Sequence, residues 1–411
     1  MARALTGAER RSVVILGIPT LLLALVVTLV TTYLPVVARE FVGSTVVIGV
    51  IVGLEGVIAL WLPLVVGSWS DRLRTPLGGR VPFLIAATPL VLVGLVALGF
   101  VSSIATLGAA ALIFFTGYFL AYEPYRALYP DAVGDEVAGR AQGTQAVWRG
   151  VGTGLALVGG GLLLAIGQAA PFVVGAVIFV AGMAAFAVAL LRQGMPEQEY
   201  PDDDATLRDA VRDVGRVVRG ERALQAFLVA NALWELSLAA LKTFVVLYVT
   251  EGLGFSRVDA SLIIGVVAVV VLVAALPSCK LADRYGALRV MWIALPVYGL
   301  GFLVPFVFSS PVVVALAIPF IALGGGVIMA LPYAILMPLM PKGEHGALTG
   351  YYSFSRGLGT WLGPLCAGVA ITAMAGVFTA TKGYQAVWGV CAAATLLSLI
   401  PLRALARERN A

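Results

Sequence analysis

Continuous apolar runs of about 20 residues recur along the whole chain and are separated by short polar segments. A run of this length forms one helix that crosses a hydrocarbon layer of ~30 Å. The strands of a membrane β-barrel would alternate apolar and polar residues, and these runs do not alternate. The pattern predicts an all-α membrane protein with 12 transmembrane helices, at 12–36, 45–67, 82–102, 105–129, 140–167, 170–192, 222–250, 258–279, 289–308, 311–338, 347–375 and 384–403.

The composition agrees with this pattern, because 60% of the 411 residues are hydrophobic and only 12% are charged. A soluble chain of this length needs more polar surface to cover its core. The basic segment "ERR" precedes an apolar run that is too long for a cleavable signal peptide. We therefore expect this run to be the first transmembrane span and not a signal peptide.

The distribution of basic residues predicts the orientation in the membrane. With the amino terminus inside, the inner segments hold 20 basic residues and the outer loops hold three. An excess of Lys and Arg marks the cytoplasmic side, so both termini are expected in the cytoplasm. The net charge of +5 reflects this orientation and not binding to nucleic acid. The preference for arginine over lysine is typical of a GC-rich bacterium, which predicts the bacterial inner (plasma) membrane.

The segment 193–221 is the longest polar stretch and is expected to link two halves. Its second half spaces apolar residues on one helical face, with arginines and acids opposite, which predicts an amphipathic helix at the inner membrane surface. The predicted organisation is therefore an N-terminal six-helix bundle at 1–192, the linker at 193–221 and a C-terminal six-helix bundle at 222–411.

The two halves repeat one another in sequence. "SDRLRTPLGGR" after the second span corresponds to "ADRYGALR" after the eighth, "PYRALYP" at 124–130 corresponds to "PYAILMP" at 332–338, and "RGVGT" at 149–153 corresponds to "RGLGT" at 356–360. Three matches in the same order, at offsets of 207 to 212, indicate two six-helix repeats.

This layout, together with the repeated Asp-Arg loop, resembles the major facilitator superfamily. The longer loop "SDRLRTPLGGRVPF" and the segment "EPYRAL" are similar to the glycoside–pentoside–hexuronide transporters and plant sucrose carriers. That resemblance implies a sugar site between two rocking halves. Sodium-coupled members place paired aspartates before the loop, where this chain has "LWLPLVVG" without an acid. Proton coupling is therefore the better expectation.

Seven charged residues lie within the predicted spans. A charged side chain that faces lipid costs roughly 2.5–3.5 kcal/mol or more, so such residues usually face a cavity and pair with one another. They are therefore candidates for function, and they are Glu55, Glu123, Arg126, Arg149, Glu235, Lys242 and Arg356.

Substrate binding is expected at the fourth and fifth spans. Glu123 and Arg126 are three positions apart and share one helical face, and Arg149 and its repeat mate Arg356 lie at similar depth. The planar donors of arginine suit sugar hydroxyls or a carboxylate. One alternative is a network of ion pairs at an inner gate. The simplest alternative is that Glu123 marks the edge of the membrane.

Proton coupling is expected at Glu123, Glu55 and Glu235. Glu235 follows Arg222 by 12 uncharged residues, about 18 Å of helix, which places it near mid-membrane. Glu55 also falls near mid-membrane among apolar residues, where a carboxyl can take up a proton near neutral pH. The structural alternative for both is an ion pair or hydrogen bond between helices. Glu235 is also a candidate substrate contact, and Lys242 lies two turns further along nearly the same face.

The cytoplasmic loop charges are candidates for a gate. In the resembled family an Asp at the end of span 2 or 8 meets a helix dipole or an arginine, and solvated loop charge is the alternative. The aromatic candidates for stacking on a sugar, or for anchoring at the interface, include Tyr125, Trp148, Trp234, Tyr351 and Tyr352. The gate residues are Asp71, Arg72, Arg80, Asp283 and Arg284.

No Cys/His cluster, nucleophile elbow or phosphate loop is present in the sequence, so neither an enzyme nor a cofactor or metal is expected. The leading hypothesis is a proton-coupled symporter of a sugar or glycoside that acts as a monomer in the lipid bilayer. The alternatives are a proton-coupled antiporter or exporter of another small organic molecule, and a non-transporting pigment or assembly factor of the same fold.

Overall fold

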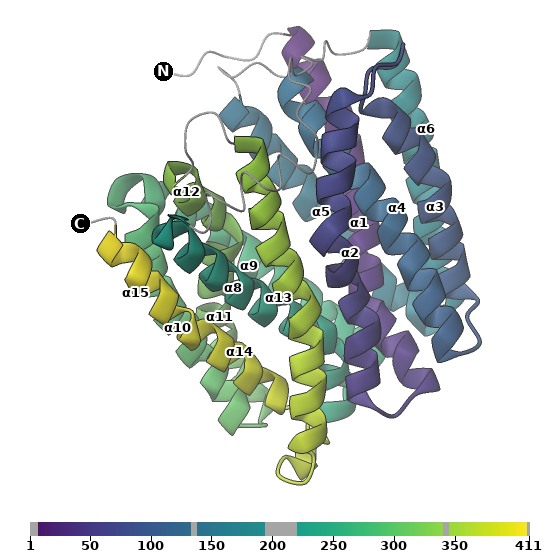
Figure 1. The fold of residues 1–411 in the computed structure, drawn as a ribbon. Coiled ribbons are helices and arrows are strands. Elements are labelled where there is room, and N and C mark those ends of the chain that lie inside the picture. The colour runs from purple at the N-terminus through teal and green to yellow at the C-terminus, as the bar shows by residue number, and fades with distance from the viewer. Residues whose placement is uncertain (1–6, 133–137, 194–219, 340–344, 409–411) are drawn as a thin grey trace. The chain divides into compact units, whose positions relative to one another are not determined.

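The computed structural model describes residues 7–132, 138–193, 220–339 and 345–408, and within these ranges the elements are helices (Figure 1). The first six long helices are α1 (Gly7–Phe41), α2 (Thr45–Arg72), α3 (Val81–Gly99), α4 (Ile104–Ala132), α5 (Ala138–Ile166) and α6 (Ala169–Gln193). The remainder are α8 (Arg222–Leu247), the π-helix η2 (Tyr248–Gly252), α9 (Arg257–Tyr285), α10 (Ala287–Val307), α11 (Pro311–Ala330), α12 (Pro332–Leu336), the 3₁₀ helix η3 (Met337–Leu339), α13 (His345–Ala373), the 3₁₀ helix η4 (Thr379–Thr381), α14 (Ala386–Leu397) and α15 (Leu399–Glu408).

Local sequence explains where several of these helices begin and end. The Ser256 side chain accepts a hydrogen bond from the Asp259 backbone N–H at 3.1 Å and so caps the start of α9. Gly286, at φ +88°, adopts a backbone conformation that suits glycine and separates α9 from α10. Pro332 opens α12 directly after α11 ends, because proline lacks the N–H that a continuing helix needs.

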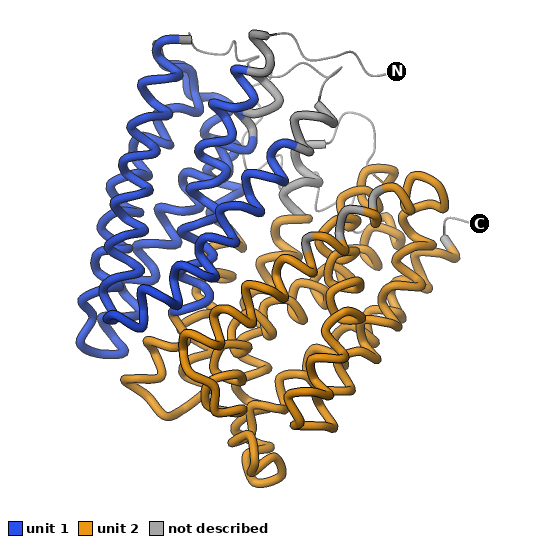
Figure 2. The backbone as a smooth tube through the Cα atoms, turned by 180° about the vertical axis from the view of Figure 1, so that it is seen from behind, with its two compact units in different colours: residues 1–33, 61–204 blue, residues 34–60, 205–411 orange. Residues whose placement is uncertain are grey.

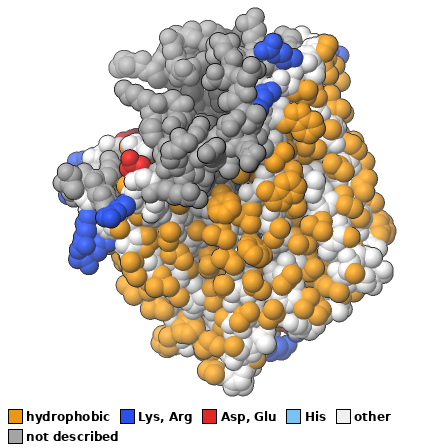
Figure 3. Space-filling view, viewed as in Figure 1, with side chains coloured by type: hydrophobic (Ala, Val, Ile, Leu, Met, Phe, Trp, Pro, Cys, Tyr) orange, Lys and Arg blue, Asp and Glu red, His pale blue; other side chains and the backbone are white. Residues whose placement is uncertain are grey.

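Each of the 12 predicted spans coincides with one helix or with two or three consecutive helices. Within the described ranges, ten helices are long and apolar enough to cross a membrane, and α9 and α13 are each 29 residues long. Hydrophobic side chains are spread widely over the described part of the face in Figure 3, and most of the visible Lys and Arg side chains lie at its edges. The predicted amphipathic helix at 193–221 lies almost entirely outside the described residues.

The chain divides into two compact units (Figure 2). Unit 1 comprises residues 1–33 and 61–204, and unit 2 comprises residues 34–60 and 205–411. The end of α1 and the start of α2 therefore group with the C-terminal helices, whereas the sequence assigned them to the first half. The predicted domain boundaries stay a prediction.

Close packing in unit 1 depends on glycines where α5 meets α1. A Cβ atom at Gly152 would collide with the backbone carbonyl of Leu21, and one at Gly17 would collide with the Trp148 indole. Small residues at such crossings let two membrane helices approach closely. Trp148 is thereby positioned by α1, next to Arg149 in the chain.

In unit 2, glycines likewise allow α13 and α8 to pack closely. A Cβ atom at Gly359 would collide with the carbonyl of Ala232, and one at Gly363 would lie 2.5 Å from the carbonyl of Leu236. The two helices therefore lie in close contact over this stretch. This contact fixes the spacing between the charged side chains of α8 and α13.

Candidate functional site

Two polar interactions between side chains join α8 to α13 in unit 2. Arg356 Nε on α13 lies 3.4 Å from Glu235 Oε1 on α8. One turn earlier on α8, Asn231 Nδ2 donates to Ser355 Oγ at 2.9 Å. Asn231 and Glu235 are one turn apart on α8, and Ser355 and Arg356 are neighbours on α13. The hydrogen bond and the ion pair therefore reinforce one another.

A second ion pair joins the same region. Lys242 Nζ on α8 lies 3.9 Å from Glu55 Oε2 on α2, and both residues belong to unit 2. Glu235 is also within electrostatic range of Lys242 and Glu55. We call Glu55, Glu235, Lys242 and Arg356 the α8 charge cluster; its two acids balance its two bases. The sequence located all four residues and placed Lys242 two turns from Glu235 on nearly the same face, but it did not pair Lys242 with Glu55.

In unit 1, α4 carries a patch of different chemistry. Arg126 Nη1 lies 3.7 Å from Glu123 Oε2, and its guanidinium lies 5.7 Å from the centre of the Tyr122 ring. Tyr122 stacks in turn on Tyr118, with ring centres 5.3 Å apart. We call Tyr122, Glu123 and Arg126 the α4 patch. Tyr122 was missed by the sequence analysis, although its position four residues before Arg126 places both on one face.

Tyr125 was predicted to contact the substrate, but the residue is only 2% exposed. Its hydroxyl donates to the Leu16 carbonyl on α1, also meets Thr20 Oγ1, and lies 3.5 Å from Gln145 Nε2 on α5. The hydroxyl therefore ties α4 to α1 and α5, and we leave Tyr125 out of the proposed site.

Trp234 was a candidate for sugar stacking or interfacial anchoring, and the structure supports neither role. Its side chain is wholly buried, and its indole N–H donates to Ser398 Oγ at 2.9 Å. Tyr352 stacks on Phe227, with ring centres 6.4 Å apart. Trp234 is therefore a core residue of unit 2, and the half-buried Tyr352 packs against Phe227.

Arg149 on α5 is exposed and lies within electrostatic range of the Tyr125 hydroxyl. Within the described part of the chain it forms no ion pair. Its repeat mate Arg356, in contrast, meets Glu235. This difference between the two halves could not be seen in the matching segments "RGVGT" and "RGLGT", because the acid lies on another helix.

The two Asp-Arg loops differ in structure. In the first, Arg80 Nη2 lies 3.4 Å from Asp71 Oδ1, so the loop closes on itself. Gly78, at φ +75°, and the Thr75 hydroxyl, which donates to the Gly78 carbonyl, form the turn between them. Arg72 is exposed at the end of α2.

In the second loop Asp283 and Arg284 are exposed, and the Arg284 guanidinium lies 5.2 Å from the Tyr285 ring centre. The shorter segment "RYGAL" separates Asp283 from Arg289, so the second loop lacks the residues that form the turn of the first.

The α1–α2 turn in unit 2 carries ion pairs that the sequence analysis missed. Arg39 Nε lies 3.0 and 3.1 Å from the two carboxylate oxygens of Glu251, and Arg257 Nη2 lies 2.9 Å from Glu40 Oε1. The Tyr384 hydroxyl donates to Glu251 at 3.3 Å, and burial together with the Glu251 charge raises the pKa of this phenol. The sequence analysis used Arg39 and Arg257 only to predict orientation, and nothing in the local sequence indicates partners so distant in the chain.

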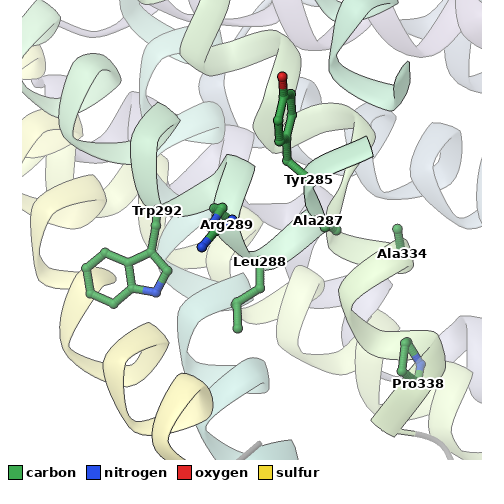
Figure 4. Close-up of a pocket in the computed structure, with 8 residues that line it drawn as sticks. Tyr285, Ala287, Leu288, Arg289, Trp292, Ala334 and Pro338 are labelled. Atoms are coloured by element: carbon green, nitrogen blue, oxygen red, sulfur yellow. The ribbon is translucent and has the colours of Figure 1, made fainter. Parts of the chain in front are cut away.

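A pocket of about 580 Å³ lies at the α9–α10 junction (Figure 4). Tyr285, Arg289 and Trp292 line one part of it, and Ala334 and Pro338 line another. None of the predicted substrate-binding residues contributes to its wall.

In the part of the chain that the structure describes, no group of three His, Cys, Asp or Glu side chains gathers. Of the cysteines, Cys366 is exposed and Cys391 is buried, and both are free thiols. The Cys391 thiol donates to the Ser237 carbonyl at 3.3 Å.

Comparison with known proteins gives a family match over most of the chain. The sequence profile of the Major Facilitator Superfamily matches residues 16–247 and 227–411. A search of curated proteins found no match.

Several solved transporters are similar in structure. A bacterial homologue of the human lysosomal transporter Spinster has a TM-score of 0.78 at 14% identity, covering 98% of each chain. The nucleoside transporter NupG has a TM-score of 0.76 at 13% identity, covering 97% of this chain and 99% of that one. A bacterial homologue of the iron transporter ferroportin has a TM-score of 0.72 at 15% identity, covering 98% and 99%. Likeness at these identities shows the fold alone.

Proposed function

Because the chain belongs to the major facilitator superfamily, and is therefore a secondary transporter of a small solute and not an enzyme, we propose that it moves a sugar or glycoside by proton-coupled symport. The observation that carries this proposal is the α8 charge cluster, in which each carboxylate holds one cation. Carboxylates with that arrangement can exchange a cation partner for a proton.

The proposed coupling step is protonation of Glu235 or Glu55. A neutral carboxyl no longer attracts its partner, so protonation of Glu235 releases Arg356 and protonation of Glu55 releases Lys242. Because Glu235 is within electrostatic range of all three other groups, a change at one carboxyl alters the balance of the whole cluster. Glu123, paired with Arg126 in unit 1, is a third proposed proton acceptor.

The α4 patch supports a sugar or glycoside as the solute. An aromatic ring offers an apolar face to a sugar ring, and a guanidinium and a carboxylate offer donors and acceptors to its hydroxyls. Tyr122, Arg126 and Glu123 bring these three chemistries together on one helix. Arg149, Trp148, Glu235 and Arg356 complete the proposed set of substrate contacts. The resemblance of the first Asp-Arg loop to the glycoside and sucrose carriers supports the same solute class.

The remaining assignments follow from the same proposal. We propose that the protein acts as a monomer in the bacterial inner membrane. The distribution of basic residues supports an orientation with both termini in the cytoplasm. Asp71, Arg72, Arg80, Asp283 and Arg284 are then cytoplasmic gate residues, and the Asp71–Arg80 contact is one that gating would break or reform.

Uptake by purified protein in liposomes tests the proposal. An inward proton gradient should drive accumulation of a labelled disaccharide, and dissipating the gradient should abolish accumulation. Acceleration by an outward gradient instead would indicate antiport and would contradict symport. A pigment that copurifies with the chain, with no uptake of any solute, would favour the assembly-factor alternative.

A further inference from the structure

A buried hydrogen-bond acceptor lies one helical turn before Glu235. Asn231 on α8 is 0% exposed, and its Nδ2 atom donates a hydrogen bond to Ser355 Oγ on α13 at 2.9 Å. Within the part of the chain that the structure describes, the Asn231 Oδ1 atom is buried without a hydrogen-bond partner. A buried amide oxygen without a donor costs free energy, so its presence needs an explanation.

The surrounding hydrogen bonds fix which amide atom of Asn231 faces Ser355. The Ser355 hydroxyl carries a single hydrogen and donates it to the Tyr352 carbonyl at 2.8 Å. Ser355 Oγ can therefore only accept from Asn231, which requires the NH₂ group of the amide on that side. Turning the amide over would place two acceptors against each other. The oxygen of Asn231 is thus the atom left for another donor.

Glu235 is the residue best placed to supply that donor. It follows Asn231 by four residues, so the two side chains share the face of α8 that meets α13. Side chains of a helix tilt toward its N-terminus, which directs the longer Glu235 side chain back toward the turn of Asn231. The carboxyl group of Glu235 can therefore reach the Asn231 amide without any change in helix register.

An ionised Glu235 cannot use this acceptor, because a carboxylate only accepts hydrogen bonds. It meets a cation instead, with Arg356 Nε at 3.4 Å. A protonated carboxyl, in contrast, has one O–H donor. The two states of Glu235 therefore need different partners, and Arg356 serves only the ionised one. The charged groups within electrostatic range of Glu235 are Arg356 from α13, Lys242 from α8 and Glu55 from α2.

The sequence repeat offers a comparison for this arrangement. Gly152 on α5 packs against the Leu21 carbonyl of α1, and Gly359 on α13 packs against the Ala232 carbonyl of α8. The α5–α1 crossing and the α13–α8 crossing are therefore equivalent, with an offset of 211 between α1 and α8.

The equivalent positions of α1 hold neither an acid nor an open acceptor. The offset places Thr20 at the position of Asn231, and the Thr20 hydroxyl is already hydrogen-bonded to the Tyr125 hydroxyl. It also places Ala24 at the position of Glu235. The acid and the open acceptor therefore occur together on α8 and are both missing from the equivalent turns of α1.

We propose that Asn231 is a positioning residue for proton coupling, whose Oδ1 atom accepts the hydrogen bond of protonated Glu235. This inference rests on the proposed function and adds the group that stabilises the protonated state. The proton binds to a carboxylate oxygen of Glu235 and stays there, the contact with Arg356 is lost, and the O–H donates to Asn231. Release of the proton reverses these changes, so Glu235 has a partner in both states.

Infrared difference spectroscopy of the purified full chain tests this assignment without any solute. The C=O band of a protonated carboxyl is followed as the pH falls, and its absence in Glu235→Gln identifies the band of Glu235. Asn231→Leu removes the acceptor and should move this band to higher wavenumber. It should also lower the pH at which Glu235 is half protonated by about 0.4–1 unit, which corresponds to the loss of one hydrogen bond.

Ser355→Ala is the matched control. It removes the same hydrogen bond between α8 and α13 but leaves Asn231 Oδ1 in place, so it should lower the thermal unfolding temperature as Asn231→Leu does. Its Glu235 band and pH of half-protonation should stay close to those of the parent chain. Asn231→Gln keeps an amide and should shift the band less than Asn231→Leu. Should Asn231→Leu not fold, Asn231→Ala makes the same test.

The outcomes separate this inference from the proposed function. A Glu235 band that is unchanged in Asn231→Leu would overturn the inference, and so would equal shifts in Asn231→Leu and Ser355→Ala. Either result would leave proton-coupled sugar transport intact, because uptake driven by a proton gradient is measured separately. A band that shifts only in Asn231→Leu, in a protein that accumulates no solute, would support the inference and overturn the proposed symport.

Discussion

The Lys242 ammonium on α8 lies 3.9 Å from the Glu55 carboxylate on α2, and Glu235, two turns before Lys242, holds Arg356 at 3.4 Å. Each carboxylate of the α8 charge cluster therefore has one cation partner from a different helix. Protonation of either acid leaves its cation without a partner, which gives the cluster a way to couple proton uptake to helix movement.

Glu235→Gln should uncouple transport from protons. The amide resembles the protonated carboxyl and cannot release or accept the proton, so uptake driven by an inward proton gradient should fall at least about tenfold. Exchange of labelled for unlabelled solute at equal pH should continue, because it needs no net proton transfer. Glu221→Gln, the same change at an exposed position beside the start of α8, is the control and should transport normally.

Exchanging the charges of Glu55 and Lys242 should rescue the damage of each single change. Glu55→Lys and Lys242→Glu each place like charges together and should lower the thermal unfolding temperature and the uptake rate. Interactions between polar side chains in membrane proteins contribute roughly 0.6–2 kcal/mol, so the coupling energy in a double-mutant cycle should fall in that range. A double variant no more stable than the worse single variant would show that the two residues do not pair.

The Arg39–Glu251 ion pair should stabilise unit 2, so that reversing one charge lowers stability and reversing both restores it. Arg39→Glu should lower the free energy of unfolding by about 1 kcal/mol, and Glu251→Arg in the same chain should restore it. Tyr384→Phe should cost roughly 0.5–1.5 kcal/mol, because it removes one hydrogen bond to Glu251.

The Tyr384 contribution should not depend on pH near neutrality. The folded-state pKa of Tyr384 is raised above its ordinary value of about 10, so the phenol stays protonated in both folded and unfolded chains below about pH 9. The stabilisation is then fully present below the unfolded pKa and is lost as the pH rises through the folded pKa. Thermal unfolding of Tyr384→Phe and the parent from about pH 6 to 9 should give a constant difference.

Two glycines on α5 should respond differently to the same substitution. A Cβ at Gly152 collides with the Leu21 carbonyl, whereas one at Gly154 meets nothing within 4 Å. Gly152→Ala should therefore destabilise the detergent-solubilised protein by about 1–3 kcal/mol, and Gly154→Ala should not destabilise it. Equal unfolding temperatures would contradict the close α5–α1 crossing.

Much of the fold could be predicted from the sequence, because its information is local. A span is a continuous apolar run, and two of the predicted spans are divided into consecutive helices, at Leu331 and at Ser398. The first break follows from Pro332. The charged residues within spans were equally visible, since so few charges occur among apolar neighbours.

Partners on another helix could not be predicted, because the choice of partner depends on how helices cross, whereas Glu123 and Arg126 lie on one helical face. Lys242 lies on nearly the same face of α8 as Glu235 but pairs with Glu55, which belongs to a distant segment of the chain. Tyr125 is an aromatic residue of the kind that can contact a sugar, yet its hydroxyl donates a hydrogen bond to a backbone carbonyl on α1. In both cases the deciding information is the approach of a second helix, which local sequence does not contain.

The central claim is that solute and protons move together in the same direction. When a disaccharide is added to proteoliposomes in weakly buffered medium, with no imposed gradient, a pH electrode measures this directly. The account predicts that the external medium becomes more alkaline as solute enters, and that Glu235→Gln abolishes this change. Solute entry with no change in external pH, or with acidification, would contradict it.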